Sequence, residues 1–417
     1  MSSPAESSGA SRASTDHREP ARDRRFDVVL NGATGFVGRL TARHLAKNAH
    51  GIRIALAGRD EAKLQALKAD LGVDWPVMVV DLADARQVAA VAAATAAVAS
   101  TAGRHGLPMA LGCAQAGTSY ADLSGEVPFV RESIRKVHDI AVETGARIVH
   151  ACGFESVPSD IGTFVLGEQV RRDEEGTLTD TTLILEVLKG GLSGGNLDSN
   201  RAQHRALRAD PVLRAAVADP WVLSAVPREA GPGDEDPSGP FRDRVTGQWL
   251  APSMGAPFNS RLVRRSASLR KDGYGPQFRY REAMGAGRSP AAPVQAAMLT
   301  LGLATLKFAL TSRVLAPIMD RALPPGSGPS AKVRENGQFR VVIHTRTSTG
   351  ARYAATVAAK GDPGYAATSV MLGQSVLSLA SDPLSSAGGV LTPSVAMGSY
   401  LADRLVAQGF TLSVARA

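Results

Sequence analysis

Cysteine and aromatic residues are scarce in this 417-residue chain. The two cysteines, Cys113 and Cys152, form no CxxC pair and no disulfide framework, which favours a reducing cytosol and two small buried thiols. Aromatic residues make up 5% of the chain, too few for a basic surface interleaved with stacking rings, although the net charge is +8. We therefore expect a cytoplasmic protein with no nucleic-acid partner.

Long uncharged apolar runs are also rare. Only Ser289 to Leu306, ahead of Lys307, approaches the length of a bilayer span, and it contains two prolines and a glutamine. We expect a buried helix there; a helix peripheral to the inner face of the plasma membrane and a transmembrane span stay open as alternatives. Residues 1–24 lack the apolar centre of a signal peptide and are expected as a disordered tail.

Alternating strand-like and helix-like segments begin at residue 26. The strand runs include FDVVLN, IRIALAG, PVMVVD, AVAST, SYADLS and RIVHACG, and amphipathic helical segments separate them. Six strands alternating with helices predict an α/β fold with a doubly wound, Rossmann-type parallel sheet. The length of the chain also predicts more than one domain, and we expect residues 25–155 to form the first, a nucleotide-binding domain.

Beyond Cys152 the pattern changes. Alternating patterns at 261–269 and 277–284, and a hairpin at 338–361 with its turn at 348–350, predict a mainly antiparallel sheet with one solvated face. We expect residues 156–364 to form an α+β domain for substrate or dimerisation. Residues 365–417 are expected as C-terminal helices that pack back on the first domain.

Three glycines follow the first strand in the pattern Gly32-x-x-Gly35-x-x-Gly38 and open a helix. Glycine permits the tight turn and lets the backbone approach a pyrophosphate at the positive end of the helix. The same spacing also occurs in turns that bind nothing, but its position in a βαβ unit favours a nucleotide site.

Arg59 follows the second strand, where an acid would suit the ribose of NAD, and arginine suits the 2′-phosphate of NADP(H). The alternative is a surface cation paired with Asp60 or Glu61. Asp81 follows the third strand and is expected at the adenine edge, or else as a helix cap. The residues expected at the cofactor are Gly32, Thr34, Gly35, Phe36, Val37, Gly38, Arg59, Asp81, Ser100 and Thr101.

Four motifs, NGATGFVGRL, LAGRDEAKL, AGTSYADLSGEVPFVRESI and ACGFESVPSDIG, resemble the saccharopine dehydrogenase-like family. The likeness is strongest to the mycobacterial trans-acting enoyl reductases, and GGLSGGNLDS and the C-terminal residues extend it over nearly everything after residue 25. The resemblance implies reduction of a polyketide or long-chain acyl double bond in complex lipid biosynthesis. The segment VASTAGRHGLP departs from the family, whose members carry a longer loop with Val-Gly-Pro-Tyr near the cofactor.

An enoyl reductase needs hydrogen-bond donors for the thioester oxygen and a proton source for the α-carbon. Tyr120, Ser124 and Glu126 follow a late strand, where such a sheet binds its ligand, and are our catalytic candidates. Their alternatives are a half-buried tyrosine, a loop hydroxyl and a helix-start acid. Glu155 and Ser156 lie on the turn into the second domain, where a site between the domains could form. Asp160 is expected to be structural.

Arg201, Arg205 and Arg208 suggest a rim for an acidic acyl carrier protein, or a solvated helix face. The sequence predicts no metal and leaves a homodimer open. Two other functions stay open beside an enoyl reductase: a saccharopine dehydrogenase-like amino-acid oxidoreductase, and a catalytically inactive nucleotide-binding or membrane-associated scaffold, which the shortened loop favours.

Overall fold

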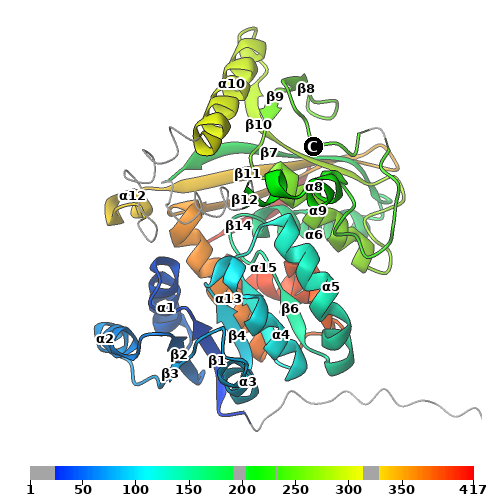
Figure 1. The fold of residues 1–417 in the computed structure, drawn as a ribbon. Helices are drawn as coiled ribbons and strands as arrows, with labels where there is room; N and C mark the ends of the chain where they lie inside the picture. The colour runs from blue at the N-terminus through cyan, green and yellow to red at the C-terminus, as the bar shows by residue number, and fades with distance from the viewer. Residues whose placement is uncertain (1–23, 191–202, 204, 232, 313–327) are drawn as a thin grey trace, which may run out of the picture.

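The computed structural model describes residues 24–190, 203, 205–231, 233–312 and 328–417. It contains two seven-stranded sheets, and Figure 1 shows the first sheet with its helices below the second. Residues 1–23 of the tail expected at 1–24 lie outside the described residues, as do Arg201 and most of the GGLSGGNLDS motif. Arg24 is described and packs on the first domain, because its guanidinium group donates to the Ala92 and Ala116 carbonyls at 2.8 and 2.7 Å.

The first sheet is parallel throughout, in the order β13-β6-β5-β4-β1-β2-β3. Its strands are β1 (Phe26–Asn31), β2 (Ile54–Gly58), β3 (Val77–Val79), β4 (Thr95–Ser100), β5 (Ser119–Asp122), β6 (Arg147–Val149) and β13 (Gly389–Leu391). The prediction of a doubly wound parallel sheet is confirmed, because all six predicted strands are present. The C-terminal region adds β13 as a seventh.

Helices cover both faces of this sheet. Those that follow its strands are α1 (Phe36–Asn48), α2 (Glu61–Leu71), α3 (Ala85–Ala94), α4 (Leu107–Gln115) and α5 (Val127–Thr144). Val29, Val98 and Tyr120 point into one apolar cluster with α3, α4 and α5. Val28 and Leu30 point to the opposite face and into the cluster shared with the second sheet. The period-2 alternation of β1 thus serves two cores.

The second sheet has the order β14-β12-β11-β7-β10-β9-β8, and all its pairs are antiparallel except β7 with β10. Its strands are β7 (Leu178–Lys189), β8 (Phe241–Arg242), β9 (Trp249–Pro252), β10 (Arg279–Gly287), β11 (Gln338–Thr347), β12 (Arg352–Lys360) and β14 (Thr411–Arg416). The mainly antiparallel sheet and its β11–β12 hairpin are confirmed. Buried and less buried residues alternate along β12, as expected for a sheet covered on one face.

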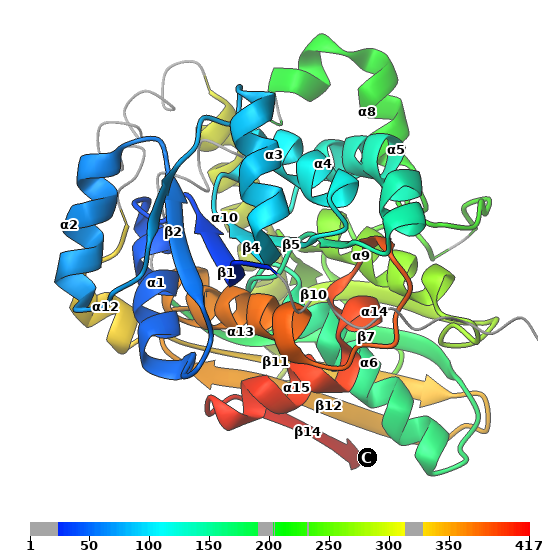
Figure 2. The ribbon, with the colours of Figure 1, turned by 90° about the horizontal axis from the view of Figure 1, so that it is seen from below.

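Three helices lie between the two sheets: α6 (Val157–Arg172), α13 (Thr368–Ser381) and α15 (Gly398–Ala407). Figure 2 shows α13 between the first sheet and β11–β12. Met371 and Leu372 of α13 share one core with Leu30 of the first sheet and Ile343 of the second. The remaining described elements are η1 (Gly103–His105), α8 (Pro211–Ala218), α9 (Ala256–Leu269), α10 (Ala292–Thr311), α12 (Ala331–Glu335), η2 (Pro363–Ala367) and α14 (Pro393–Ala396).

Two predictions for the second half of the chain are wrong. Residues 261–269 belong to helix α9 and not to a strand. The alternating pattern that predicted a strand counts Arg264 and Arg265 as exposed, whereas both side chains are fully buried in the helix. Their guanidinium groups donate to backbone carbonyls, including those of Asp234 and Val390. Helix α10, expected to be buried, is mostly exposed. By length and composition alone, it is long and apolar enough to span a membrane. The C-terminal helices are present, but β14 joins the second sheet.

Candidate active site

The glycine turn between β1 and α1 has the close packing that its spacing predicts. Gly32 has a φ of 75°, and a Cβ there would lie 2.6 Å from the Oγ1 atom of Thr101. A Cβ on Gly38 would lie 2.2 Å from the backbone oxygen of Gly32 and 2.8 Å from that of Ala33. Only glycine fits both positions, so helix α1 starts directly against the end of β1.

The start of α1 fits a pyrophosphate. Gly35 is the exposed N-cap residue, and within the described chain no side chain accepts a hydrogen bond at this cap and no acid lies in the first turn. The first N–H groups of a helix lack intrahelical acceptors and carry the positive end of its dipole. Thr34, Phe36 and Val37 are half-buried around this turn. The turn therefore offers N–H donors to an anion such as a dinucleotide phosphate.

Ser100 and Thr101 support the same turn from the end of β4. Thr101 donates from its N–H group to the Asn31 carbonyl at 3.0 Å and from Oγ1 to the Gly32 carbonyl at 2.9 Å. The Asn31 amide donates to Ser100 Oγ at 3.2 Å. The structure thus brings both residues to the glycine turn, where they hold the ends of β1 and β4 together.

Arg59 lies exposed at the end of β2. Asp60, one of the two acids proposed to pair with it, caps α2 and forms its ion pair with Lys63 at 3.0 Å. Among the residues that the structure describes, Arg59 forms no ion pair. Its guanidinium group can therefore meet a phosphate without breaking an existing contact, and its role at the 2′-phosphate stays a prediction.

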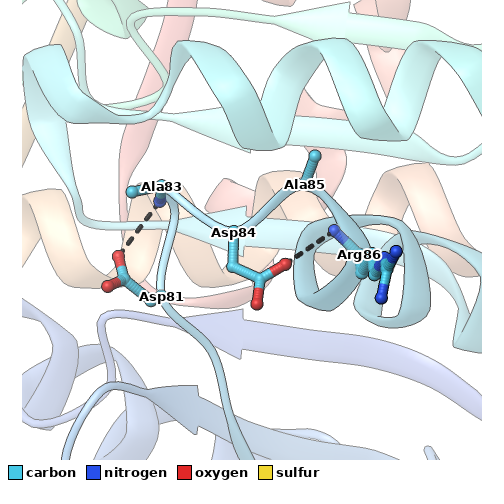
Figure 3. A pocket seen from close by; sticks show the side chains of 5 residues that line it. All are labelled: Asp81, Ala83, Asp84, Ala85 and Arg86. Atoms are coloured by element: carbon cyan, nitrogen blue, oxygen red, sulfur yellow. Dashed lines mark hydrogen bonds between the residues drawn. The ribbon is translucent and has the colours of Figure 1, made fainter.

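Asp81 follows β3 beside an open depression that Asp84 and Arg86 also line (Figure 3). The Asp81 carboxylate accepts a hydrogen bond from the Ala83 N–H group at 3.0 Å. Asp84, and not Asp81, caps α3 by accepting from the Arg86 N–H group at 2.9 Å. Asp81 thus stays at the carboxyl edge of the sheet, where the expected contact with the adenine remains a prediction.

Asp122, the last residue of β5, is the centre of a buried hydrogen-bond network that sequence reasoning missed. Its carboxylate accepts from Tyr120 Oη at 3.0 Å, from Ser124 Oγ at 3.1 Å and from His150 Nδ1 at 3.0 Å. His150 Nε2 lies 2.8 Å from Ser133 Oγ. Because a carboxylate only accepts, His150 Nδ1 carries a proton and donates it to Asp122.

The Ser133–His150–Asp122 arrangement resembles a hydrolase relay in its order of contacts, but none of its members reaches solvent. Their exposed fractions are 0%, 1% and 0%. Tyr120 is also fully buried; burial and the neighbouring Asp122 carboxylate raise its pKa well above the usual value. The network therefore fixes the loop after β5 and offers no nucleophile to a substrate.

The chain after β6 makes a strained turn beside this network. Ala151 has a φ of 58°, a conformation that costs a non-glycine residue roughly 1 kcal/mol or more and that clusters at functional sites. The next residue returns to β5, because the Cys152 N–H group donates to the Asp122 carbonyl at 2.8 Å. The turn then places Glu155 over Gly125, where an added Cβ would lie 3.7 Å from the Glu155 side chain.

Glu155 is the exposed acid of this turn. Protein atoms around the carboxyl group desolvate it, and the negative charges of Glu126 and Asp122 act in the same direction. Together they raise the pKa of Glu155 to about 8. Glu126 itself is the half-buried N-cap residue of α5. The structure thus places one predicted catalytic residue, Glu126, close enough to influence the pKa of Glu155. Glu155 is protonated at neutral pH, and the residue is exposed.

Ser156 and Asp160, on the same segment, bind the second domain instead of facing solvent. Ser156 Oγ donates to the Asn259 amide oxygen of α9 at 2.7 Å. Asp160 is fully buried and accepts from the Ser394 N–H group at 2.7 Å and from the hydroxyl groups of Ser394 and Ser266. Asp160 ties α6 to α9 and α14, in keeping with its expected structural role.

A ring contact connects the glycine turn with the Glu155 turn. Phe36 meets Tyr365 of η2 edge to face, with ring centroids 4.9 Å apart. Burial raises the pKa of Tyr365 to about 12, and nearby carboxylates including Glu155 add to the shift. The Phe154 N–H group donates to Thr368 Oγ1, just beyond η2, at 3.0 Å. η2 and the residue after it therefore contact both the nucleotide turn and the turn that carries Glu155.

Comparison with known proteins identifies the family of this chain. Residues 28–149 match the family model of the saccharopine dehydrogenase NADP binding domain. A Mycobacterium tuberculosis protein provisionally named a trans-acting enoyl reductase is 45% identical over 415 residues, covering 95% of this chain and 99% of its own. The trans-acting enoyl reductase of Mycobacterium ulcerans is 42% identical, covering 94% and 98%. The chain belongs to the saccharopine dehydrogenase family.

The fold of this family member agrees with that of a solved enzyme. Saccharopine dehydrogenase (L-Glu forming) from Saccharomyces cerevisiae superimposes with a TM-score of 0.53 at 16% identity, covering 94% of this chain and 99% of the yeast chain. The matched domain confirms the prediction of NADP(H) as cofactor, and the protein is an NADP-binding oxidoreductase. Glu155 lies six residues beyond the matched domain, on the turn into the second domain.

Two features of the sequence point to the buried network of this family member. Asp122 ends the strand SYAD and His150 follows the strand RIV, so both lie at the carboxyl edge of neighbouring parallel strands. Ser133 carries no such signal, since its place in the middle of α5 only predicts a buried helix position.

Proposed function

We propose that this oxidoreductase is a trans-acting enoyl reductase that reduces the α,β-double bond of a polyketide or long-chain acyl thioester in complex lipid biosynthesis. The observation that carries the proposal is Glu155, a solvent-reachable acid with a raised pKa at the carboxyl edge of the NADP-binding sheet. The names of relatives that are 41–45% identical support the same reaction.

When bound, NADPH supplies the hydride that reaches the β-carbon of the substrate. The α-carbon then needs a proton, and Glu155 is the acid that can donate it, because its pKa of about 8 leaves it protonated at neutral pH. Solvent exposure lets water return the proton after each turnover. Glu126 contributes through its charge, which disfavours ionisation of Glu155.

The Asp122 network acts as positioning machinery in this proposal. Tyr120 and Ser124 both donate to Asp122, so their hydroxyl protons are engaged within the protein. The same carboxylate contributes negative charge at Glu155. Asp122 thereby connects the shape of the loop after β5 with the protonation of the proposed donor.

The thioester partner in this proposal is carried by an acidic acyl carrier protein. Arg205 and Arg208 are exposed in the helical segment 205–209, in support of a basic contact on the second domain. Their charges favour an acidic surface or the phosphate of a phosphopantetheine arm. An Arg205→Glu, Arg208→Glu variant is expected to lose activity on carrier-bound thioesters and to retain activity on short coenzyme A thioesters.

The decisive experiment follows NADPH oxidation with a series of enoyl thioesters at several pH values. We expect wild-type kcat to fall tenfold per pH unit above about pH 8, as Glu155 loses its proton. Glu155→Gln is expected to lower kcat by about 10²- to 10⁴-fold with NADPH binding unchanged. The matched control, Glu143→Gln on the exposed side of α5, is expected to leave both unchanged.

Glu126→Gln separates proton donation from simple structural damage. Removing this charge is expected to move the alkaline fall in kcat to lower pH, because a negative neighbour of Glu155 is gone. A wild-type-like pH profile and rate in Glu155→Gln would show that another group donates the proton. Turnover only on amino-acid substrates would point to the saccharopine-type alternative, and NADPH binding without any turnover to the scaffold.

A further inference from the structure

Helix α10 carries the largest group of exposed apolar side chains on one described element. Val294, Met298 and Leu301 are 63%, 68% and 68% exposed. The window Ala292–Ala309 has a mean hydropathy of 1.2, and 11% of it is buried. Figure 1 shows α10 beside β9 and β10, at the end of the molecule away from α2 and α3. Such a surface marks an interaction site.

The exposed positions extend over a broad arc of α10, because small or apolar residues such as Ala297, Gly302 and Ala304 are also exposed. A helix that packs on a second protein or a second copy presents a narrower apolar stripe with polar flanks. Two polar side chains are satisfied internally: Thr300 and Thr305 donate to the carbonyls four residues earlier, each at 2.8 Å. These features favour a lipid over a protein surface.

The charges around α10 favour anionic headgroups. No charged residue occurs from Ser289 to Leu306, and the exposed Arg288 and Lys307 stand at its two ends. The chain as a whole carries a net charge of +8. An uncharged apolar helix bracketed by cations matches a bilayer interface, where the cations meet phosphate and the apolar side chains enter the acyl boundary.

The packing of α10 limits how far this helix can enter a bilayer. Ala292 and Ala296 are fully buried in contact with the second sheet, where α10 meets β9 and β10. One side of the helix is therefore occupied by protein along its first turns, which rules out a lipid environment on all sides. We propose that α10 docks this protein on an anionic phospholipid bilayer by lying in the interface, with Val294, Met298 and Leu301 inserted.

The test is flotation of the full chain with vesicles. Vesicles of phosphatidylglycerol mixed with phosphatidylcholine are compared with vesicles of phosphatidylcholine alone, at low and high salt. We expect binding to the anionic vesicles that weakens with salt, and at least about a tenfold loss of partitioning in Met298→Ser, Leu301→Ser. The matched control, Val142→Ser, Val406→Ser, changes two side chains of 50% and 48% exposure on α5 and α15.

Insertion has its own readout, because a Met298→Trp variant is expected to shift its fluorescence to the blue on anionic vesicles only. NADPH affinity in solution serves as the folding control for every variant. The proposal is overturned by failure to bind either vesicle type, by equal binding to both types, or by equal losses in the α10 and control variants. Self-association of the wild type that Met298→Ser, Leu301→Ser removes would assign the helix to a second copy and also overturn it.

Discussion

Gly38→Ala tests the packing on which the nucleotide site depends. In an open helix, alanine is favoured over glycine by roughly 1 kcal/mol. At Gly38 the new Cβ would lie 2.2 Å from the Gly32 carbonyl oxygen and 2.8 Å from that of Ala33, whereas ordinary contact begins at 3.4 Å. Both obstacles are backbone atoms, so no side chain can swing away. Overpacking of this kind costs about 1–3 kcal/mol even where side chains can adjust.

The clash therefore outweighs helix propensity, and we expect Gly38→Ala to lower the free energy of unfolding by about 2 kcal/mol or more. Displacement of α1 from β1 also moves the N–H donors, so NADPH affinity is expected to fall at least tenfold. Urea unfolding and NADPH fluorescence titration measure the two effects. Gly302→Ala is the matched control, since nothing lies within 4 Å of its added Cβ in α10, and it is expected to be neutral or stabilising. A Gly38→Ala protein as stable as wild type, with normal NADPH affinity, would refute this reasoning.

Three further changes probe acid stability, the domain contact and cofactor choice. His44 is 9% exposed beside the Gln374 amide, and burial lowers its pKa to about 4 from 6.5. The folded chain then binds fewer protons than the unfolded chain, so about 3 kcal/mol of stability is lost as pH falls from 6.5 to 4. Urea unfolding of His44→Gln should show less of this loss. An equal loss in the variant and the wild type would exclude His44 as its source. Arg265 donates to two buried carbonyls, one of them on Val390. Arg265→Met is therefore expected to lower the free energy of unfolding by about 3 kcal/mol in chemical unfolding. A decrease under 0.5 kcal/mol, roughly that of a surface substitution, would contradict a stabilising role for these hydrogen bonds. Arg59→Ala is expected to weaken NADPH binding roughly 10- to 100-fold and leave NADH unchanged in calorimetric titration; equal effects on both cofactors would remove Arg59 from the 2′-phosphate site.

Local patterns predicted most of the first domain, because each of its features is encoded within a few residues. The glycine turn needs only the preceding strand and the helix that it opens, and both lie within residues 26–48. β13 escaped prediction because a three-residue strand has little periodicity of its own and is created by pairing with β6. Its neighbour lies more than 200 positions earlier in the chain.

The errors in the second domain arose because the sequence does not show which side chains of a helix are covered by other parts of the protein. Arg264 and Arg265 are buried because distant carbonyls accept their hydrogen bonds, and hydropathy patterns have no access to those partners. The opposite error occurs at α10, where an apolar sequence predicts burial although the protein covers only part of it. In both cases the local composition is correct for a helix, and the tertiary partner decides whether the side chains are buried.

The buried network around Asp122 was beyond local prediction for the same reason. Asp122, Ser133 and His150 come from two parallel strands and a helix, and only the β5–β6 pairing brings them together. Single residues in this network look ordinary in sequence. Tyr120, which the sequence suggested as a proton donor, donates its hydroxyl hydrogen bond to Asp122.

The two glutamates near this network show how position assigns different roles to identical side chains. Glu126 stands at the N-terminus of α5, where the helix dipole stabilises a carboxylate. Burial desolvates the Glu155 carboxyl group, and the negative charges of Glu126 and Asp122 also favour its protonated form. The surroundings of Glu155 therefore keep this acid protonated at neutral pH, as acid catalysis there requires. In the proposed reaction Glu155 gives up the proton that Glu126 helps it to retain.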